Sequence, residues 1–307
     1  MSVKVFIDGS SGTTGLRIAD RLAARPEIEL LSISAEGRKD VHERAKVINS
    51  ADLAFLCLPD AASKEVMPLL RPDVKVLDTS TAFRTDPAWD YGFPELNGQK
   101  EKIQRSYRVA VPGCYASGFI SIARPLVELG LAPADSPFSC TGISGYSGGG
   151  KKMIAEYEDP DRDGCHDSSR IYGLNQHHKH LPEMQAVCGL TVPPVFSPVV
   201  GDFYCGMATT VLLQTALLPG QPTAAQIHEA LEAAYAGQRF VRVAPLDTPA
   251  MLYANTLAGT NELRLFVCGH DAQLTVTALF DNLGKGASGA AVQNLNIMLG
   301  VPEDTGL

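Results

Sequence analysis

Short apolar segments alternate with amphipathic segments in the first third of the chain, and this alternation predicts its fold. The apolar segments are residues 3–8, 28–33, 51–58 and 74–78, and residues 16–24 carry apolar side chains at helical spacing. Nearly continuous apolar strands that alternate with helices are typical of a parallel sheet covered on both faces. We therefore expect an α/β, Rossmann-type doubly wound parallel sheet here.

The pattern changes after about residue 115. Residues 119–129 predict an amphipathic helix, and residues 223–236 predict another, with Thr223 as its N-cap. Strand-like runs dominate the rest, at residues 209–218, 239–244, 263–268 and 273–280. The glycine-rich segment 142–150 and the proline-rich segment 192–198 predict loops. These features favour a second, α+β domain for catalysis and oligomerisation.

The end of the chain is expected to return to the first domain. Residues 286–299 have a helical pattern and follow the last predicted strand. We therefore expect a nucleotide-binding domain made of residues 1–115 plus 286–307. The α+β domain then spans residues 116–285.

Charge and cysteine usage exclude several classes of protein. The 307 residues carry a net charge of −8 and no basic run, so nucleic acid and anionic membranes are not expected partners. No apolar run reaches the roughly 20 residues of a spanning helix, and no secretory signal precedes the first strand. The 7 cysteines are scattered, without a Cys-x-x-Cys pair, which favours a reducing cytoplasm over a disulfide framework or a zinc site.

A glycine-rich loop follows the first predicted strand directly. Its residues are Gly9, Ser10, Ser11, Gly12, Thr13, Thr14 and Gly15. Glycines let the backbone turn tightly and approach a pyrophosphate, whose charge is favoured at a helix N-terminus. The loop therefore indicates a dinucleotide site, and a tight turn without a ligand is the alternative.

The end of the second strand bears on the choice of dinucleotide. An acidic residue there would bind the ribose diol of NAD, whereas Ser34 followed by Arg38 and Lys39 suits a 2′-phosphate. Glu36 lies between them and weakens the distinction, and an exposed Arg-Lys pair is also common in solvated loops. We favour NADP(H) over NAD.

Cys114 is the candidate nucleophile. It follows Pro112-Gly113 and precedes the predicted helix. A cysteine at a helix N-terminus has a lowered thiol pKa, and the same N–H groups could hold the oxyanion formed when a thiolate attacks a carbonyl. The other six cysteines are interpreted as small apolar side chains, Cys165 with the least support.

A histidine cluster is the candidate base. His177, His178 and His180 fall within four positions, and histidine titrates near neutral pH. Glu183 could orient an imidazole, and Tyr172 could donate to a bound oxygen. A zinc site lacks further ligands with suitable spacing, so no metal is expected; a solvated polar loop is the other alternative. The four remaining histidines stand alone, and we expect no chemical role for them.

Taken together, the motifs resemble the N-acetyl-gamma-glutamyl-phosphate reductases in their shorter bacterial form, within the semialdehyde dehydrogenase superfamily. The resemblance covers nearly the whole chain. It rests on the glycine loop, Asp78-Thr-Ser80-Thr-Ala-Phe83-Arg84, Pro112-Gly113-Cys114-Tyr115, Ser144-Gly-Tyr-Ser147-Gly148-Gly149-Gly150, His178-Lys-His180-Leu-Pro182-Glu183 and Asp281-Asn282-Leu-Gly-Lys285-Gly286.

This resemblance implies an activity and an assembly. The activity is NADPH-dependent reduction of N-acetyl-gamma-glutamyl phosphate to N-acetylglutamate 5-semialdehyde and phosphate in arginine biosynthesis. The assembly is a homotetramer or homodimer. The family's catalytic cysteine corresponds to Cys114, and its acid–base histidine lies in the His-x-His pattern, where we favour His180 over His178, with Tyr172 and Glu183 in support.

The remaining site residues are also implied by the resemblance. It places Ser80, Arg84, Ser144 and Gly145 around the substrate. Cofactor contacts are expected from Ser147, Gly148, Gly149, Asn282, Lys285, Gly286 and Asn294. Arg84 suits a bidentate clamp for carboxylate or phosphate, and a surface ion pair is the alternative. The sequence departs from longer relatives at Ala116-Ser117 and Lys151, which leaves the phosphate contacts open.

Other functions share parts of this pattern. An aspartate-semialdehyde dehydrogenase or an aminoadipyl-phosphate reductase would use the same cysteine chemistry with a different pocket. A cysteine hydrolase would need no glycine loop, and a non-catalytic dinucleotide-binding protein would need no activated thiol. The sequence favours the acyl-phosphate reductase with a Cys114 thioester.

Overall fold

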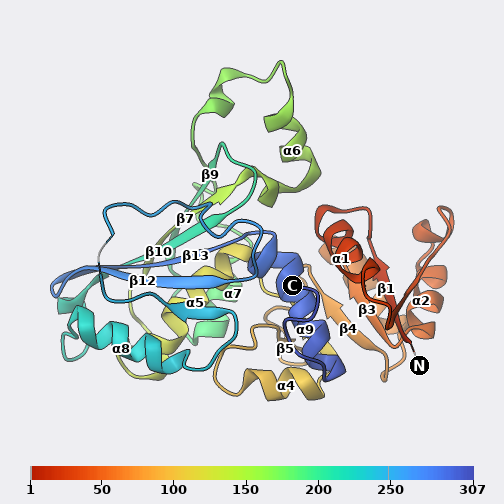
Figure 1. Cartoon of the computed structure of the whole chain (residues 1–307), viewed down its shortest axis with the longest axis horizontal. Coiled ribbons are helices and arrows are strands. Elements are labelled where there is room, and N and C mark those ends of the chain that lie inside the picture. The colour runs from red at the N-terminus through yellow and green to blue at the C-terminus, as the bar shows by residue number, and fades with distance from the viewer. Residues whose placement is uncertain (1, 248) are drawn as a thin grey trace. The chain divides into compact units, whose positions relative to one another are not determined.

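The computed structural model describes residues 2–247 and 249–307 (Figure 1). By its internal contacts the chain divides into two compact units, which are described separately. Unit 1 comprises Met1–Pro94, Gly98–Pro112 and Ala287–Leu307. Unit 2 comprises Glu95–Asn97 and Gly113–Gly286.

Unit 1 is built on a parallel sheet. Within the described ranges its strand order is β2-β1-β3-β4-β6-β5. The strands are β1 (Val3–Asp8), β2 (Ile28–Leu31), β3 (Leu53–Leu56), β4 (Lys75–Asp78), β5 (Asp90–Tyr91) and β6 (Arg108–Ala110). The helices are α1 (Thr13–Ala23), α2 (Val41–Ser50), α3 (Asp60–Val66), α4 (Gln99–Arg105) and α9 (Gly289–Leu299), with short 3-10 turns η1 (Gly37–Lys39) and η2 (Met67–Leu69).

Alternate residues of these strands enter two separate cores. Val5 and Phe55 pack in a core with residues of α1, α4 and α9. Phe6 and Leu56 pack in another core with residues of α2 and α3. Because successive side chains of a strand point to opposite faces, each core lies on one face of the sheet. The predicted doubly wound parallel sheet is confirmed.

Helix α9 packs against α1, α4 and β4, so the C-terminal segment belongs to unit 1. In Figure 1 it is the blue helix among the red and orange elements of that unit. The helix is shorter than predicted from residue 286, because Gly284–Ser288 form a π-helical turn, η6, before it. Arg25 of the α1–β2 connection donates to Oδ1 of Asn296 at 2.6 Å and ties this helix to the sheet.

Unit 2 contains a mixed sheet with helices. The strand order over the described residues is β11-β12-β13-β10-β7-β9-β8, with β7–β9 and β11–β12 parallel. The strands are β7 (Ser139–Gly145), β8 (Arg170–Ile171), β9 (Val195–Gly201), β10 (Met207–Gln214), β11 (Val241–Val243), β12 (Leu263–His270) and β13 (Gln273–Phe280). The helices are α5 (Cys114–Glu128), α6 (Gly150–Glu158), α7 (Leu181–Cys188) and α8 (Ala224–Ala234), with 3-10 turns η3 (Tyr146–Gly149), η4 (Gly164–Asp167) and η5 (Thr215–Leu217).

The helices α5, α7 and α8 form a layer on the sheet. Helix α5 packs on β10 and β13 and contacts both α7 and α8. Thr223 caps α8 as predicted, with a reciprocal capping box to Gln226. The predicted α+β composition of the second half of the chain is confirmed.

Two predicted loops are only partly right, because some of their residues lie in strands. Residues Gly142–Gly145 belong to β7, where a Cβ on Gly142 would lie 2.4 Å from Cδ1 of Tyr115. That glycine therefore makes room for an aromatic ring and does not mark a turn. Residues Val195–Pro198 belong to β9, and the carbonyl of Pro198 accepts the N–H of Tyr172. The strand predicted over 209–218 ends at Gln214, before η5.

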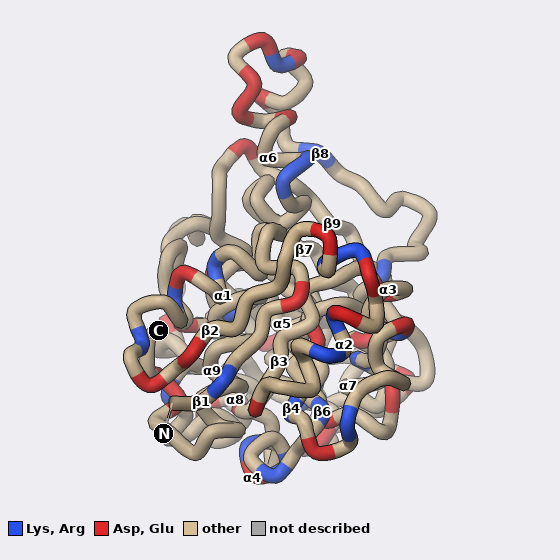
Figure 2. Tube along the Cα trace, turned by 90° about the vertical axis from the view of Figure 1, so that its right-hand side faces the viewer, with Lys and Arg blue, Asp and Glu red and all other residues tan. Residues whose placement is uncertain are grey.

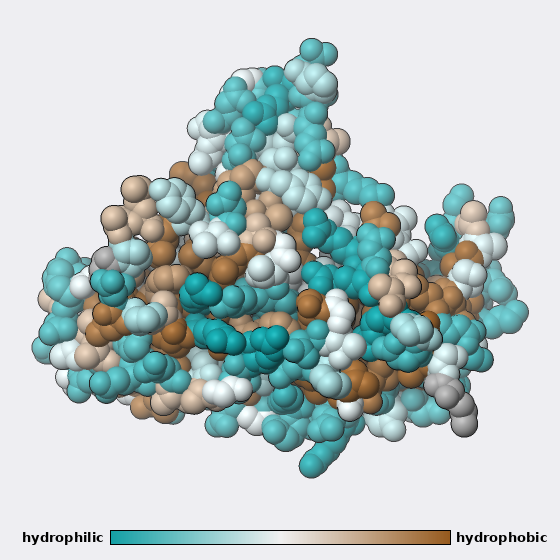
Figure 3. Space-filling view, viewed as in Figure 1, coloured by the Kyte–Doolittle hydropathy of each residue, from teal (hydrophilic) through white to brown (hydrophobic). Residues whose placement is uncertain are grey.

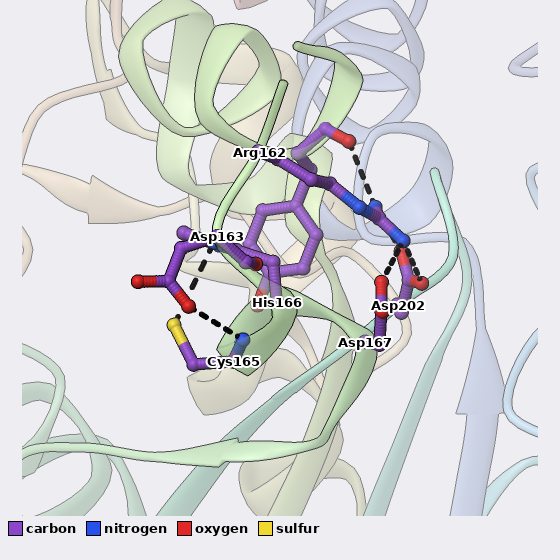
Figure 4. A network of polar contacts seen from close by, with 7 residues as sticks. Arg162, Asp163, Cys165, His166, Asp167 and Asp202 are labelled. Atoms are coloured by element: carbon purple, nitrogen blue, oxygen red, sulfur yellow. Dashed lines mark hydrogen bonds and ion pairs between the residues drawn. The ribbon is translucent and has the colours of Figure 1, made fainter. Parts of the chain in front are cut away.

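An excursion over residues 146–172 extends from the sheet of unit 2 and carries α6 at the top of Figure 1. Positively and negatively charged residues occur along this excursion (Figure 2), and its visible face is mainly hydrophilic (Figure 3). Arg162 fastens it by bonding Asp167 at 2.5 Å and Asp202 at 2.7 Å (Figure 4). The guanidinium lowers the pKa of Asp202, so this exposed network stays ionised and holds the excursion to the β9–β10 turn.

Candidate active site

Cys114 is the first residue of α5, which begins before the amphipathic pattern of residues 119–129. Gly113 is the N-cap, with extended backbone (φ −78°, ψ 148°), and the first turn holds no acidic residue. The thiol is half-buried and lies at the positive end of the helix dipole, which favours the thiolate. Such a position is typical of nucleophilic cysteines, and the role of Cys114 stays a prediction.

Glu183 connects the N-termini of two helices. It lies in the first turn of α7, is 2% exposed, and accepts the main-chain N–H of Gly113 at 2.8 Å through Oε1. A hydrogen bond to a carboxylate is stronger than one between neutral groups. Glu183 thus fixes the peptide immediately before Cys114. Its expected role in orienting an imidazole stays a prediction.

His178 is held by contacts on both ring nitrogens. Its Nδ1 accepts the main-chain N–H of His180 at 3.2 Å, and its Nε2 lies 3.5 Å from the hydroxyl of Tyr172. Burial, and secondarily the charge of Lys179, lowers the pKa of His178 to about 4. His178 is therefore neutral at physiological pH.

His180 is the N-cap residue of α7 and is 4% exposed. Its ring lies 4.8 Å from that of His178 and 6.1 Å from that of Tyr115, centroid to centroid. Tyr115 follows Cys114 in α5, and α5 packs against α7. The cysteine helix and the histidine cluster are thus neighbours within unit 2.

Tyr172 belongs to the same cluster. Burial is the main cause that raises its pKa to about 12, and the charge of an ionised Cys114 contributes as well. A phenol with a raised pKa stays neutral and can donate a hydrogen bond. The expected contact of Tyr172 with a bound oxygen stays a prediction.

The serine-glycine segment lies at the end of β7. Ser144 is buried and donates to the carbonyl of Gly145 at 3.0 Å. Asn282 donates to Oγ of Ser147 at 3.0 Å and accepts the N–H of Gly206 at 2.8 Å. A Cβ on Gly148 would lie 3.1 Å from Oγ of Ser144, whereas one on Gly149 would strike Met153 at 2.4 Å. These residues form one packed group, and their substrate and cofactor contacts stay predictions.

Gly286 lies directly against the nucleophile. A Cβ at this position would be 2.9 Å from Cβ of Cys114, so any side chain there would displace the cysteine. Its neighbour Lys285 is 0% exposed and donates to both carboxylate oxygens of Glu95 at 2.8 Å. The ammonium group is engaged by this carboxylate, a contact that the sequence did not suggest.

The glycine loop of unit 1 forms one wall of a cavity of about 380 Å³. Gly9 has φ +86°, and a Cβ on it would lie 2.3 Å from the carbonyl oxygen of Cys57. A Cβ on Gly15 would lie 2.5 Å from the carbonyl oxygen of Gly9. Only glycine fits either position. Thr13 and Thr14 then begin α1, with Gly12 as its N-cap.

Some of the predicted cofactor residues line this cavity. Its wall includes Gly9, Ser10, Ser11 and Arg38, together with apolar residues of β1 and β2. Oγ of Ser34 accepts the N–H of Gly37 at 3.0 Å and so shapes the turn that carries Arg38. Lys39 is exposed at the end of the same 3-10 turn and is not part of the wall. The cavity is large enough for part of a dinucleotide.

Asp8 also lines the cavity, although no sequence motif pointed to it. Its Oδ2 lies 2.9 Å from Nε of Arg44, and the two side chains are 5% and 7% exposed. Burial raises the pKa of Asp8, and Arg44 partly opposes that rise. An acidic residue at the end of a first strand is visible in the sequence, but its partner in α2 is not.

Three predicted site residues of unit 1 are buried and form hydrogen bonds with other residues of that unit. Ser80 donates to Oδ2 of Asp78 through N and Oγ, at 2.9 and 2.5 Å. Arg84 is 9% exposed and donates to the carbonyls of Val111 and Thr79 at 2.9 and 3.0 Å, so it is not a surface side chain. Asn294 donates to the carbonyls of Gly92 and Ala290, each at 2.8 Å. Their ligand contacts stay predictions.

The interpretation of the other cysteines is only partly confirmed. Cys140 and Cys188 are buried, Cys57, Cys205 and Cys268 are half-buried, and Cys165 is exposed. No group of three or more His, Cys, Asp or Glu side chains that could hold a metal ion occurs among residues 2–247 and 249–307. Within those same ranges no helix is long and apolar enough to cross a membrane.

The chain is similar to known proteins over nearly its whole length. The profile of the semialdehyde dehydrogenase NAD binding domain matches residues 4–105, and that of the semialdehyde dehydrogenase dimerisation domain matches residues 114–282. Solved aspartate semialdehyde dehydrogenases share the fold. That of Francisella tularensis has a TM-score of 0.72, at 16% identity over 97% of this chain and 100% of that one. The Candida albicans enzyme with NADP has a TM-score of 0.65, at 14% identity over 97% and 99%.

Curated relatives are much closer in sequence. The N-acetyl-gamma-glutamyl-phosphate reductase 2 of Nostoc sp. is 48% identical over 99% of both chains. The N-acetyl-gamma-glutamyl-phosphate reductase of Brucella anthropi is 48% identical over 98% of this chain and 99% of that one. Together with the cysteine at a helix start and the adjacent histidine cluster, these matches show that the chain belongs to the N-acetyl-gamma-glutamyl-phosphate reductases of the semialdehyde dehydrogenase family.

Proposed function

We propose that the chain reduces N-acetyl-gamma-glutamyl phosphate to N-acetylglutamate 5-semialdehyde and phosphate, a step of arginine biosynthesis, through a thioester on Cys114. The observation that carries this proposal is the position of Cys114 at the start of α5, beside the histidine cluster at the start of α7. A nucleophile next to an imidazole is what covalent acyl transfer requires.

The first stage transfers the acyl group to sulfur. The thiol proton of Cys114 passes to His180, and the thiolate attacks the acyl carbon. A carbon–sulfur bond forms, and the bond between that carbon and the phosphate oxygen breaks, with its electron pair leaving on phosphate. We expect N–H groups at the start of α5 and the hydroxyl of Tyr172 to stabilise the negative oxygen of the intermediate.

The second stage yields the aldehyde. NADPH, when bound, supplies the hydride that reduces the thioester carbon. The carbon–sulfur bond then breaks, and its electron pair returns to sulfur, which takes back the proton held by His180. A thioester accepts a hydride far more readily than a carboxylate does, and the covalent bond holds the acyl carbon in the active site for the hydride transfer.

The cavity beside the glycine loop supports NADP(H) as the cofactor. Gly9, Gly12 and Gly15 allow close approach of a pyrophosphate at the N-terminus of α1. Arg38 lines the same cavity and suits the additional 2′-phosphate. These features favour NADP(H) over NAD.

The proposal also covers surroundings and assembly. A reducing cytoplasm would keep Cys114 as a thiol. A homodimer or homotetramer is supported by the match of residues 114–282 to a dimerisation domain. Exposed apolar side chains on strands of that region, such as Ile143, Val195 and Leu212, are consistent with such an assembly.

One assay tests the proposed reaction and its nearest alternatives. Purified protein is mixed with NADP and phosphate, and the absorbance of NADPH is followed after adding N-acetylglutamate semialdehyde, aspartate semialdehyde or N-acetylaminoadipate semialdehyde. We expect the highest kcat/KM with N-acetylglutamate semialdehyde. A preference for either other aldehyde would replace the substrate. Thioester formation alone liberates one phosphate per subunit, so only continuous phosphate release beyond that amount, without NADPH, would indicate a hydrolase.

A further inference from the structure

A fully buried ion pair lies next to the nucleophile. Nζ of Lys285 is 2.8 Å from both carboxylate oxygens of Glu95, and the two side chains are 0% and 1% exposed. Glu95 comes from the tripeptide Glu95–Asn97, which packs in unit 2 although the residues on both sides of it belong to unit 1. The chain thus makes a short excursion that brings a carboxylate to Lys285.

Stability alone is a weak reason for such a pair. Removing two charges from water costs several kcal/mol each, and well-packed apolar side chains in the same place are often equally stabilising. A buried ion pair does, however, fix the position of both partners, because each charge needs the other. The relevant question is therefore which part of unit 2 the pair immobilises.

Lys285 lies in the π-helical turn Gly284–Ser288, between two glycines that each pack closely against another residue. A Cβ on Gly284 would lie 2.1 Å from the carbonyl oxygen of Thr260, and one on Gly286 would lie 2.9 Å from Cβ of Cys114. The N–H of Gly286 also bonds the carbonyl of Asp281 at 2.9 Å. A shift of Lys285 would therefore move Gly286 against Cys114.

We propose that Glu95 is a positioning residue: through Lys285 it holds the Gly284–Ser288 turn against Cys114 and so fixes the direction of the thiol. This inference rests on the proposed function only in taking Cys114 as the nucleophile. In this proposal Lys285 helps to hold the thiol of Cys114 in position. Glu95 itself touches no reacting atom.

The test compares stability with thiol reactivity. The variants are Glu95→Gln, Lys285→Met and the apolar pair Glu95→Leu/Lys285→Met, with Lys100→Met as control, because Lys100 pairs with Glu303 at an exposed site. The measurements are Tm, the rate and pH profile of Cys114 alkylation by iodoacetamide, read by peptide mass spectrometry, and kcat and KM for the reductase reaction. Alkylation reports on Cys114 even if the reductase activity were absent.

We expect both single variants to lower Tm, since each leaves one buried charge without its partner. The apolar pair should regain Tm, yet alkylate Cys114 and turn over about 10- to 100-fold more slowly, with KM for NADP unchanged, because small displacements of a reacting group cost that much. Lys100→Met should match the wild type. An apolar pair with wild-type alkylation and kcat would overturn the proposal, since the ion pair would then only fill space.

A second variant keeps the test decisive if the apolar pair does not fold. Glu95→Asp retains the charge and shortens the side chain, so the ion pair can re-form only by moving the turn. We expect a lower kcat and slower Cys114 alkylation with little change in Tm. Unchanged kcat and alkylation would contradict the positioning role. Wild-type protein without reductase activity would refute the proposed function and leave the alkylation comparison readable.

Discussion

The main-chain N–H of His180 donates a hydrogen bond to Nδ1 of His178, with 3.2 Å between the two nitrogens. An accepting Nδ1 in a neutral imidazole places the proton on Nε2, which lies 3.5 Å from the hydroxyl of Tyr172. The lone pair of His178 is therefore used by its neighbour. We therefore expect His180 to exchange the proton with Cys114 and His178 to orient His180.

Substitution of the two histidines separates these roles. We expect His180→Asn to lower kcat by about 10²- to 10⁴-fold, the usual contribution of a general acid–base. His178→Asn should cost less, because an amide oxygen can still accept the N–H of His180. Steady-state kinetics of both variants checks the assignment, with the exposed His42→Asn as control. An equal or greater loss in His178→Asn would move the base to His178.

The low pKa of His178 also predicts a pH-dependent stability. The unfolded chain protonates this imidazole below about 6.5, whereas the folded chain resists protonation until about 4. The unfolded state therefore binds more protons between these two pH values. The contribution of His178 to the free energy of unfolding is fully present above about pH 6.5 and is lost as the pH falls towards 4.

The His178→Asn variant lacks this titrating imidazole. Its free energy of unfolding should therefore decrease less than that of the wild type as the pH falls. The measurement is the urea midpoint of wild type and variant at several pH values from about 4 to 7. The comparison must be between proteins, because burial raises the pKa values of Asp8 and Asp78, which favours the folded state as pH falls. Parallel curves for the two proteins would show that His178 does not titrate as described.

Replacing the nucleophile should separate chemistry from cofactor binding. Cys114→Ser retains the size of the side chain but offers a much weaker nucleophile, so we expect reductase turnover to fall below detection. NADP binding, measured by calorimetry or fluorescence, should remain near the wild-type value, because the glycine-loop cavity is formed within unit 1. Residual turnover close to that of the wild type would end the covalent mechanism.

Local patterns in the sequence were sufficient to predict the parallel sheet, and they also locate the candidate nucleophile at the start of a helix. Strands such as β1 and β3 are buried on both faces, and the resulting apolar runs are visible without any knowledge of the fold. Cys114, His178 and His180 are identified by motifs only a few residues long. The contacts between these motifs depend on the packing of α5 against α7.

Features that depend on distant residues could not be predicted. Glu95 and Lys285 are 190 positions apart, and Asp8 and Arg44 are 36 apart, with no shared motif to connect them. Gly142 was misassigned to a loop because a missing side chain looks the same in a turn and in a tightly packed strand. Its reason for being glycine is the ring of Tyr115, which reaches it from another element.

The cofactor preference depends on Arg38. Loss of one charge-assisted contact with a 2′-phosphate costs about 1.5–3 kcal/mol, so Arg38→Ala should weaken NADP binding by roughly 10- to 100-fold. NAD lacks that phosphate, and its affinity should change little. Lys39→Ala is the matched control, since Lys39 is outside the cavity wall. Equal losses for both nucleotides would show that Arg38 supports the cavity without reading the phosphate.

The final prediction concerns the contribution of the buried Asp8–Arg44 ion pair to the stability of unit 1. Nε of Arg44 lies 2.9 Å from Oδ2 of Asp8, and both side chains are under a tenth exposed, at 7% and 5%. Arg44→Met leaves the carboxylate buried without this partner, which costs about 3–5 kcal/mol. Urea unfolding measures the loss. The exposed Arg71–Asp73 pair provides the control, and Arg71→Met should change stability by about 0.5 kcal/mol or less.

The loss in Arg44→Met should also depend on pH, and its sign follows from Asp8. Burial is the main cause that raises the pKa of this carboxyl, and both contributions of Arg44 oppose the rise. Removing Arg44 therefore raises the pKa of Asp8 further. A raised folded-state pKa adds stability at acid pH that is lost as pH rises through it. The stability lost in Arg44→Met should accordingly be smaller at about pH 5 than at about pH 8. An equal loss at both pH values would show that it comes from the lost packing of the arginine side chain and not from the charge of Asp8.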